Sequence, residues 1–202
     1  SNEESLNALM IAKKNNFLDI IEMLNKKEEN TKLSDSSSNQ IKANNKVKIL
    51  ELAKHHNIEK DSENAILIEA TKTNAKDLIE LLIKSGADLE ARDYNASTPL
   101  IIASENNRKD LVELFLDNGA NIEAKDVDGF TALLKSSKVN AKETAKLLID
   151  RGANIEAINN EEENALMIAA RSNFLEFASL LLDNEANIES ENFEIWSPLL
   201  NA

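Results

Sequence analysis

Short apolar runs alternate with polar segments along the chain, and this alternation has a fixed period. A small polar residue precedes each of the clearest runs, and four such residues follow one another at intervals of 33 residues: Thr98, Thr131, Asn164 and Ser197. One period before Thr98 lies Ala65, in the run AILIEAT, and a similar run, NALMIAKKNNF, begins at Asn7. Because self-similarity at such a period is typical of repeat architectures, the pattern predicts a stack of repeats.

Each repeat carries the signals of two helices. The opening Thr, Asn or Ser suits an N-cap, whose side-chain oxygen accepts a hydrogen bond from a free backbone N–H. Pro99 and Pro198 follow at the first helical position, where a missing N–H costs nothing. A second series of apolar residues has helical spacing and predicts the second helix, as in Leu111, Val112, Leu114 and Phe115.

Asparagine recurs between the two predicted helices. The series is Asn16, Asn74, Asn107, Asn140 and Asn173, and Asn45 joins it if a repeat begins at Ser36. A tight turn there needs a residue with positive φ, which asparagine tolerates better than most residues that have a side chain. The series therefore predicts left-handed turn residues, and Asn107→Gly is expected to be neutral or mildly stabilising.

Glycine marks the end of the second helix. Gly86, Gly119 and Gly152 suit a left-handed C-terminal cap, whereas Glu185 replaces glycine in the last full repeat and is expected to be strained. Polar segments such as ADLEARD and ANIEAKD follow and predict projecting hairpins. Each repeat is therefore predicted to be a helix, a tight turn, a second helix and a hairpin.

With these elements the chain resembles ankyrin-repeat proteins, whose repeat of about 33 residues starts T-P-L-H-x-A-A and continues to L-L-L-x-x-G-A-D-V-N. The matching segments are TPLIIA (98–103), LFLDNGANIEA (114–124) and DVDGFTAL (126–133). The histidine of the family motif is absent, and apolar residues replace it: Ile68, Ile101, Leu134, Met167 and Leu200. Its hydrogen bonds at the hairpin must therefore be lost or replaced by packing.

The resemblance implies an all-α repeat solenoid of about six repeats and a partial C-terminal one, in a single ankyrin-repeat domain over residues 1–202. The expected division is 7–35, a first repeat with an irregular loop; 36–64, a degenerate repeat; then 65–97, 98–130, 131–163 and 164–196; and a partial repeat at 197–202.

Composition and charge narrow the chemistry. The formal net charge of −13 disfavours nucleic acids and anionic membranes as partners, and fits either a basic partner or simple solubility. Cysteine is absent, and the adjacent His55 and His56 point in different directions on a helix, so we expect no metal site, no cofactor and no enzymatic activity. The run from Glu161 to Glu163 could bind a basic peptide or a cation weakly, or could simply be solvated.

The resemblance also implies a concave face, lined by hairpins and first helices, that binds other proteins. Aromatic residues are typical of binding hot spots, and Tyr94 and Phe130 are expected to lie on adjacent hairpins as an exposed pair. The full set of candidate protein-binding residues is Tyr94, Asn95, Ser97, Glu105, Asn106, Val127, Asp128, Phe130, Lys138, Glu161, Arg171, Phe193 and Trp196.

These observations predict a monomeric, non-catalytic scaffold that binds a protein partner and neither nucleic acid nor membrane. The expected location is the cytoplasm, or the host cytosol for a secreted effector. The alternative is that the chain is the ankyrin-repeat targeting region of a larger enzyme, channel or secreted effector, whose active domain lies outside these residues.

Overall fold

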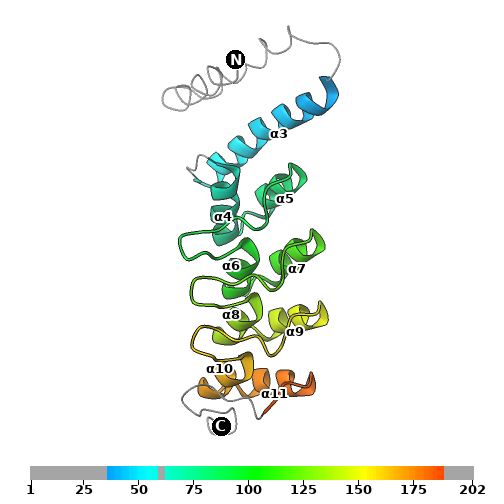
Figure 1. Ribbon diagram of the computed structural model, residues 1–202. Helices are drawn as coiled ribbons and strands as arrows, with labels where there is room; N and C mark the ends of the chain where they lie inside the picture. Colours follow the sequence, from blue (N-terminus) through cyan, green and yellow to red (C-terminus); the bar gives the residue numbers. More distant parts are fainter. Residues whose placement is uncertain (1–35, 59–61, 189–202) are drawn as a thin grey trace. The chain divides into compact units, whose positions relative to one another are not determined.

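The computed structural model describes residues 36–58 and 62–188 (Figure 1). Within these ranges the chain forms nine helices joined by turns and loops, with no β-strand. The all-helical repeat architecture is therefore confirmed, and the predicted hairpins are loops in which no strand forms. The chain divides into two compact units, residues 1–52 and residues 53–202, which we describe separately.

The N-terminal unit is described from Ser36, where α3 begins. This helix continues without interruption from Ser36 to His55, and its last residues, from Ala53, belong to the C-terminal unit. Asn45 lies inside the helix, so the turn predicted there is wrong. The physical reason is that neither glycine nor proline interrupts α3. An asparagine inside a helix destabilises it by less than about 1 kcal/mol relative to alanine. The left-handed residue is instead Asn57, beyond the end of the helix, with φ 56°.

The C-terminal unit contains four pairs of antiparallel helices. The pairs are α4 (Glu63–Thr73) with α5 (Lys76–Lys84), α6 (Pro99–Glu105) with α7 (Lys109–Asp117), α8 (Ala132–Lys138) with α9 (Lys142–Asp150), and α10 (Ala165–Arg171) with α11 (Leu175–Asp183). The first helices, α4, α6, α8 and α10, pack on one another in order, and α7, α9 and α11 form a second row. The connecting loops project beside the row of first helices (Figure 1).

The first helices begin at the predicted polar caps. Thr98, Thr131 and Asn164 each accept a hydrogen bond from the backbone N–H three residues further on, at 3.4, 3.3 and 2.9 Å. The remaining first helix, α4, starts earlier than the period suggests. Its cap is Ser62, whose hydroxyl accepts from the N–H of Ala65 at 3.2 Å, because Ala65 itself has no side-chain acceptor.

The predicted turn residues adopt the left-handed conformation. The φ angles of Asn74, Asn107, Asn140 and Asn173 are 58°, 51°, 55° and 56°. The glycines at the ends of α5, α7 and α9 have φ between 86° and 89°, and Glu185 takes the same conformation with φ 68°. These predictions are confirmed, while Asn16 lies outside the described residues. A side chain in this region is disfavoured, so Glu185 is strained relative to glycine.

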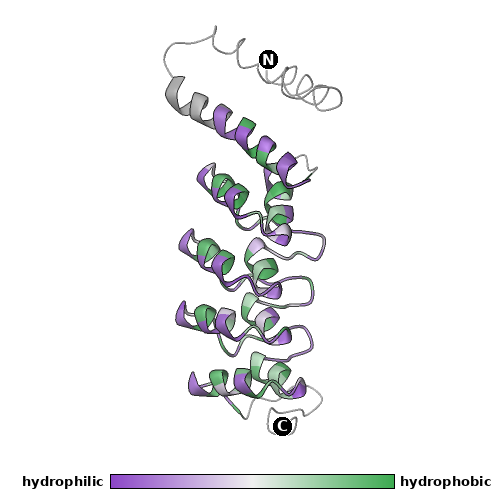
Figure 2. Cartoon of the chain, turned by 180° about the vertical axis from the view of Figure 1, so that it is seen from behind, coloured by the Kyte–Doolittle hydropathy of each residue, from purple (hydrophilic) through white to green (hydrophobic). Residues whose placement is uncertain are grey.

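The core lies between the two rows of helices, which carry both apolar and polar residues (Figure 2). Leu100, Leu111, Phe115 and Leu133 are among its fully buried side chains. At the place of the family's motif histidine, the side chains of Ile68, Ile101, Leu134 and Met167 are also buried. Packing therefore replaces the histidine at these four positions, whereas Leu200 lies outside the described residues.

Candidate functional site

Backbone hydrogen bonds join neighbouring loops at their tips. The N–H of Val127 donates to the carbonyl of Asn95, and the N–H of Asn160 donates to the carbonyl of Asp128, both at 2.9 Å. The side-chain amide of Asn160 also donates to the carbonyl of Val127 at 2.9 Å. Equivalent residues of successive repeats therefore lie side by side in a fixed register.

Each loop is also held by a side chain at its own base. Asp93, Asp126 and Asn159 occupy the same place in successive loops, and each accepts hydrogen bonds from two backbone N–H groups of its own loop at 2.8–3.0 Å. Glutamate side chains then connect one repeat to the next. Glu90, Glu123 and Glu156 accept at 2.8 Å from the backbone N–H groups of Asn121, Asn154 and Asn187. The loops are thus held by hydrogen bonds both within and between repeats.

The loop tips carry the most exposed apolar side chains of this face. We call the tip row the following residues: Tyr94, Asn95, Val127, Asp128, Asn160 and Glu161. Tyr94 is 87% exposed and Val127 is 55% exposed, and they occupy equivalent positions in adjacent loops. The ammonium of Lys72 lies 5.5 Å from the ring centre of Tyr94 and 3.3 Å from the carboxylate of Asp93. This cation therefore links the exposed ring to the base of its own loop.

Phe130 does not belong to the tip row. Its side chain is buried, and it occupies the place of Ser97 rather than that of Tyr94. The ammonium groups of Lys135 and Lys138 lie 5.0 and 5.1 Å from the centre of its ring. The predicted exposed pair of Tyr94 and Phe130 is wrong, because Phe130 directly precedes the cap of α8 at the base of the loop. The exposed neighbour of Tyr94 is Val127.

The loop bases contain further candidates that are not free to bind. Ser97 is buried, at 3% exposure. At the same place in a later loop the carboxylate of Glu163 is buried and forms an ion pair with Arg171. Candidates in this layer position the loops, and the tips above them present the accessible surface.

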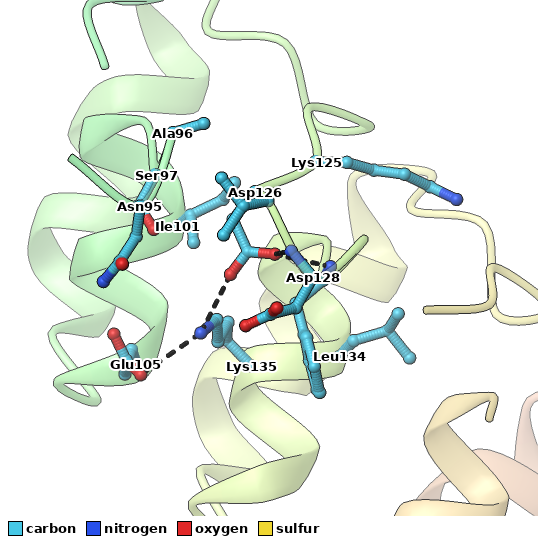
Figure 3. Close-up of polar contacts among 12 residues, drawn as sticks. Asn95, Ala96, Ser97, Ile101, Glu105, Lys125, Asp126, Asp128, Leu134 and Lys135 are labelled. Carbon is cyan, nitrogen blue, oxygen red and sulfur yellow. Dashed lines mark hydrogen bonds and ion pairs between the residues drawn. The ribbon is translucent and has the colours of Figure 1, made fainter. Parts of the chain in front are cut away.

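Lys135 forms the most buried ion-pair network of this face (Figure 3). Its ammonium lies 2.9 Å from the carboxylate of Asp126 and 3.3 Å from that of Glu105 on α6. Burial alone would lower the pKa of Lys135, but the hydrogen bond to Asp126 and the charges of Glu105 and Asp126 outweigh it, so the pKa stands above its usual value. The network fixes the loop before α8 to both α6 and α8.

Charged residues at the ends of the first helices flank the tip row. Lys72, Glu105, Lys138 and Arg171 occupy the same position in successive repeats, and all four are exposed. Lys138 makes no ion pair within the described residues. Asn106, beside Glu105, donates from its side chain to the carbonyl of Ile102 at 2.8 Å and so satisfies the end of α6.

The structure thus separates the candidates into three layers. Tyr94, Asn95, Val127, Asp128 and Glu161 lie at loop tips; Ser97 and Phe130 lie at loop bases; Glu105, Asn106, Lys138 and Arg171 lie at helix ends. Phe193 and Trp196 lie outside the described residues. Sequence reasoning missed the pairing of Asp126 with Lys135. The available signal was Lys135 itself, because the equivalent positions in the two neighbouring repeats have the apolar residues Ile102 and Ile168.

Over residues 36–58 and 62–188, no group of three or more His, Asp or Glu side chains is arranged to hold a metal ion. Over the same ranges, no helix is both long and apolar enough to cross a membrane. What this face can supply is apolar contact at the tips, surrounded by charged groups.

Stacked helix pairs with projecting, mutually hydrogen-bonded loops define the class of protein: an all-α repeat solenoid. The chain belongs to the ankyrin-repeat family, because a model of ankyrin repeats in three copies matches residues 37–126 and 123–192. No curated protein compared with the chain is similar enough to be counted as a relative. Ankyrin repeats are generally protein–protein interaction modules.

Proposed function

We propose that this chain is a monomeric, non-catalytic scaffold that binds a protein partner through the tip row and the adjoining ends of the first helices. The observation that carries the proposal is the exposure of Tyr94 and Val127 side by side on loops whose backbones are already hydrogen-bonded to each other. The family supports a role in protein binding, and the tip row supplies the place.

The energetics of binding favour this surface. A tyrosine gives a large contact area at a small cost in conformational entropy, and such residues dominate the energy of many interfaces. The loops beneath Tyr94 and Val127 are held by the hydrogen bonds described above, so little ordering remains to oppose association. The charged helix ends form the polar rim that surrounds a typical apolar contact.

A peptide-display selection tests the proposal without a known partner. A random-peptide library is selected on the immobilised chain, and enriched peptides are titrated calorimetrically against the wild type and the double variant Tyr94→Ser/Val127→Ser. We expect the variant to bind at least about tenfold more weakly. Its melting temperature should stay close to that of the wild type, because both side chains are exposed.

The chain offers a matched control in the other row of helices. Leu175 and Leu182 on α11 are 74% and 46% exposed, so Leu175→Ser/Leu182→Ser removes a similar amount of exposed apolar surface. This control should bind the selected peptides as the wild type does. Equal weakening by both double variants, or full binding by the tip-row variant, would place the site elsewhere.

A further inference from the structure

We infer that the partner segment is an extended peptide whose side chains meet the tip row in the order apolar, apolar, basic, with one contacting side chain for each repeat. The inference rests on the proposed function and specifies the chemistry of the partner. It follows from three observations: the fixed register of the loops, the apolar pair at Tyr94 and Val127, and the acidic groups beside Asn160.

The register of the loops sets the spacing of the contacts. Neighbouring loops are joined directly by the hydrogen bonds from Val127 to Asn95 and from Asn160 to Asp128. Packed helices lie about 8–10 Å apart, and the loops that follow them share this spacing. A peptide in the extended polyproline II conformation advances about 3.1 Å per residue and completes one turn every three residues, so every third side chain faces the row and comes opposite the next loop.

The apolar part of the row occupies two adjacent loops. Tyr94 and Val127 are exposed at equivalent places, and the corresponding residue of the next loop is the polar Asn160. Two apolar side chains of a peptide, three residues apart, can each cover one of the two exposed side chains. The third contacting side chain then reaches the loop of Asn160, where the surface changes from apolar to acidic.

The acidic part of the row has unsatisfied charge. Asp128 and Glu161 of the tip row are exposed, the adjacent Glu162 outside the row is partly buried, and none of the three forms an ion pair within the described residues. The next carboxylate, on Glu163, is different because Arg171 already neutralises it. A basic side chain placed here gains the attraction of three carboxylates, and an acidic side chain would be repelled.

Nearby cations do not cancel this preference. The guanidinium of Arg92 donates to the carbonyls of Ala96 and Lys125, and the ammonium of Lys125 donates to the carbonyl of Ile158. Both side chains are therefore held along the loops below the tips. Lys138, at the end of α8, lies over the buried ring of Phe130 at the loop base.

Three synthetic, fluorescein-labelled peptides test the inference by fluorescence anisotropy. The first has two leucines three residues apart and an arginine three residues beyond, on a background of serine and glycine. The second has glutamate in place of the arginine, and the third has the composition of the first with the leucines adjacent to each other. We expect the first peptide to bind about tenfold more tightly than either of the others at low salt.

A charge-reversed protein makes the test specific to these carboxylates. In the variant Glu161→Lys/Glu162→Lys the glutamate peptide should bind more tightly than the arginine peptide. Lysine, like glutamate, has a Cβ atom, so it adds no new strain at the positive φ of 60° at position 162. Added salt should reduce both preferences, because exposed charges are screened.

The inference would be overturned if the arginine and glutamate peptides bound the wild type equally. It would also be overturned if the peptide with adjacent leucines bound as tightly as the first peptide. The proposed function has its own readout. Display-selected peptides could bind the wild type, bind Tyr94→Ser/Val127→Ser more weakly, and yet lack the order apolar, apolar, basic. That result would overturn the inference but would leave the proposed binding surface in place.

Discussion

Asn107 has two roles at the turn between α6 and α7. Its backbone takes the left-handed conformation, and its side-chain oxygen accepts a hydrogen bond from the hydroxyl of Thr144 at 2.8 Å. Thr144 is fully buried and belongs to the next repeat. The residue at the place of Thr144 in the preceding repeat is Leu111, which has no donor. Accordingly, the buried side-chain oxygen of Asn74 has no hydrogen-bond partner among the described residues.

We predict different effects of glycine at these two asparagines. Asn107→Gly should destabilise the protein by about 1 kcal/mol, because a buried hydroxyl without an acceptor costs about 1–3 kcal/mol and glycine recovers part of this at positive φ. Asn74→Gly should be neutral or stabilising, because no hydrogen bond of its side-chain oxygen is lost. Urea unfolding midpoints of the two variants provide the measurement. A neutral Asn107→Gly, as the turn alone suggests, would show that the bond to Thr144 contributes nothing.

At the scale of elements, neighbouring repeats contain two solutions to one packing problem. The loop before α8 has Asp126 at its base and Lys135 on the helix, whereas the loop before α10 has Asn159 and Ile168 at the same places. In the second repeat a neutral amide, which donates to the carboxylate of Glu163 at 3.2 Å, and an apolar side chain take the places of the ion pair. Both side chains of the ion pair are buried.

A double-mutant cycle between these two solutions gives the second prediction. Lys135→Ile alone should cost about 3 kcal/mol or more, because it leaves the carboxylate of Asp126 buried without a cation. Adding Asp126→Asn removes the uncompensated charge and should restore part of the lost stability, although Phe130 stands where the loop of Asn159 has Glu163 as the acceptor of the amide. Chemical denaturation of the two single variants and the double variant measures the coupling. A double variant whose loss equals the sum of the single losses would mean that the pair does not act as a unit.

The raised pKa of Lys135 gives a prediction about alkaline pH. A lysine whose pKa is higher in the folded than in the unfolded protein stabilises the fold fully below the unfolded value, about 10.4. That contribution is lost as the pH rises through the folded value. The stability advantage of the wild type over Asp126→Asn/Lys135→Ile should therefore shrink above about pH 10.4. Unfolding midpoints measured from neutral to alkaline pH test this, and a constant difference would contradict it.

At the scale of the whole molecule, the described helices differ in how much they bury. Among the described side chains of α3, only Ile49 and Ala53 are buried, whereas nearly every side chain of α6 and α8 is buried. In a repeat protein, stability is approximately a sum over repeats and their interfaces with neighbours. The chain should therefore open first where burial is lowest.

Hydrogen exchange measures this order directly. We predict that amides of residues 36–57 exchange through more frequent opening than those of residues 103–149. The reason is that local opening is easiest where few apolar contacts must be broken. Uniform protection across both ranges would show that α3 opens only together with the helix pairs that follow it.

The repeat architecture could be predicted from the sequence because each signal is local. A cap such as Thr98, a turn asparagine such as Asn107 and a helix-end glycine such as Gly86 act within a few residues of their own position. The placement of Phe130 could not be predicted in the same way, because its ring lies beside Lys135 and Lys138 of the following helix, and these contacts are not visible in the pattern of the loop itself. Tyr94 was identified correctly as exposed, but its neighbour required the register between loops that the structure supplies.

Site prediction therefore failed at contacts between repeats. Asp126 and Lys135 look unremarkable one by one, and the structure shows that they form a pair. The bond between Asn107 and Thr144 joins residues 37 positions apart, beyond the reach of any pattern within one repeat. The family provides the architecture, while these residues give the chain its own contacts between repeats.

The most direct test of the binding surface is an amide chemical-shift map of the isotopically labelled chain titrated with a display-selected peptide. The proposed function predicts that the largest changes lie at Tyr94, Asn95, Val127 and Asp128, with smaller changes at Glu105 and Lys138. Changes concentrated instead on α5, α7, α9 and α11, with the tip row unaffected, would contradict it.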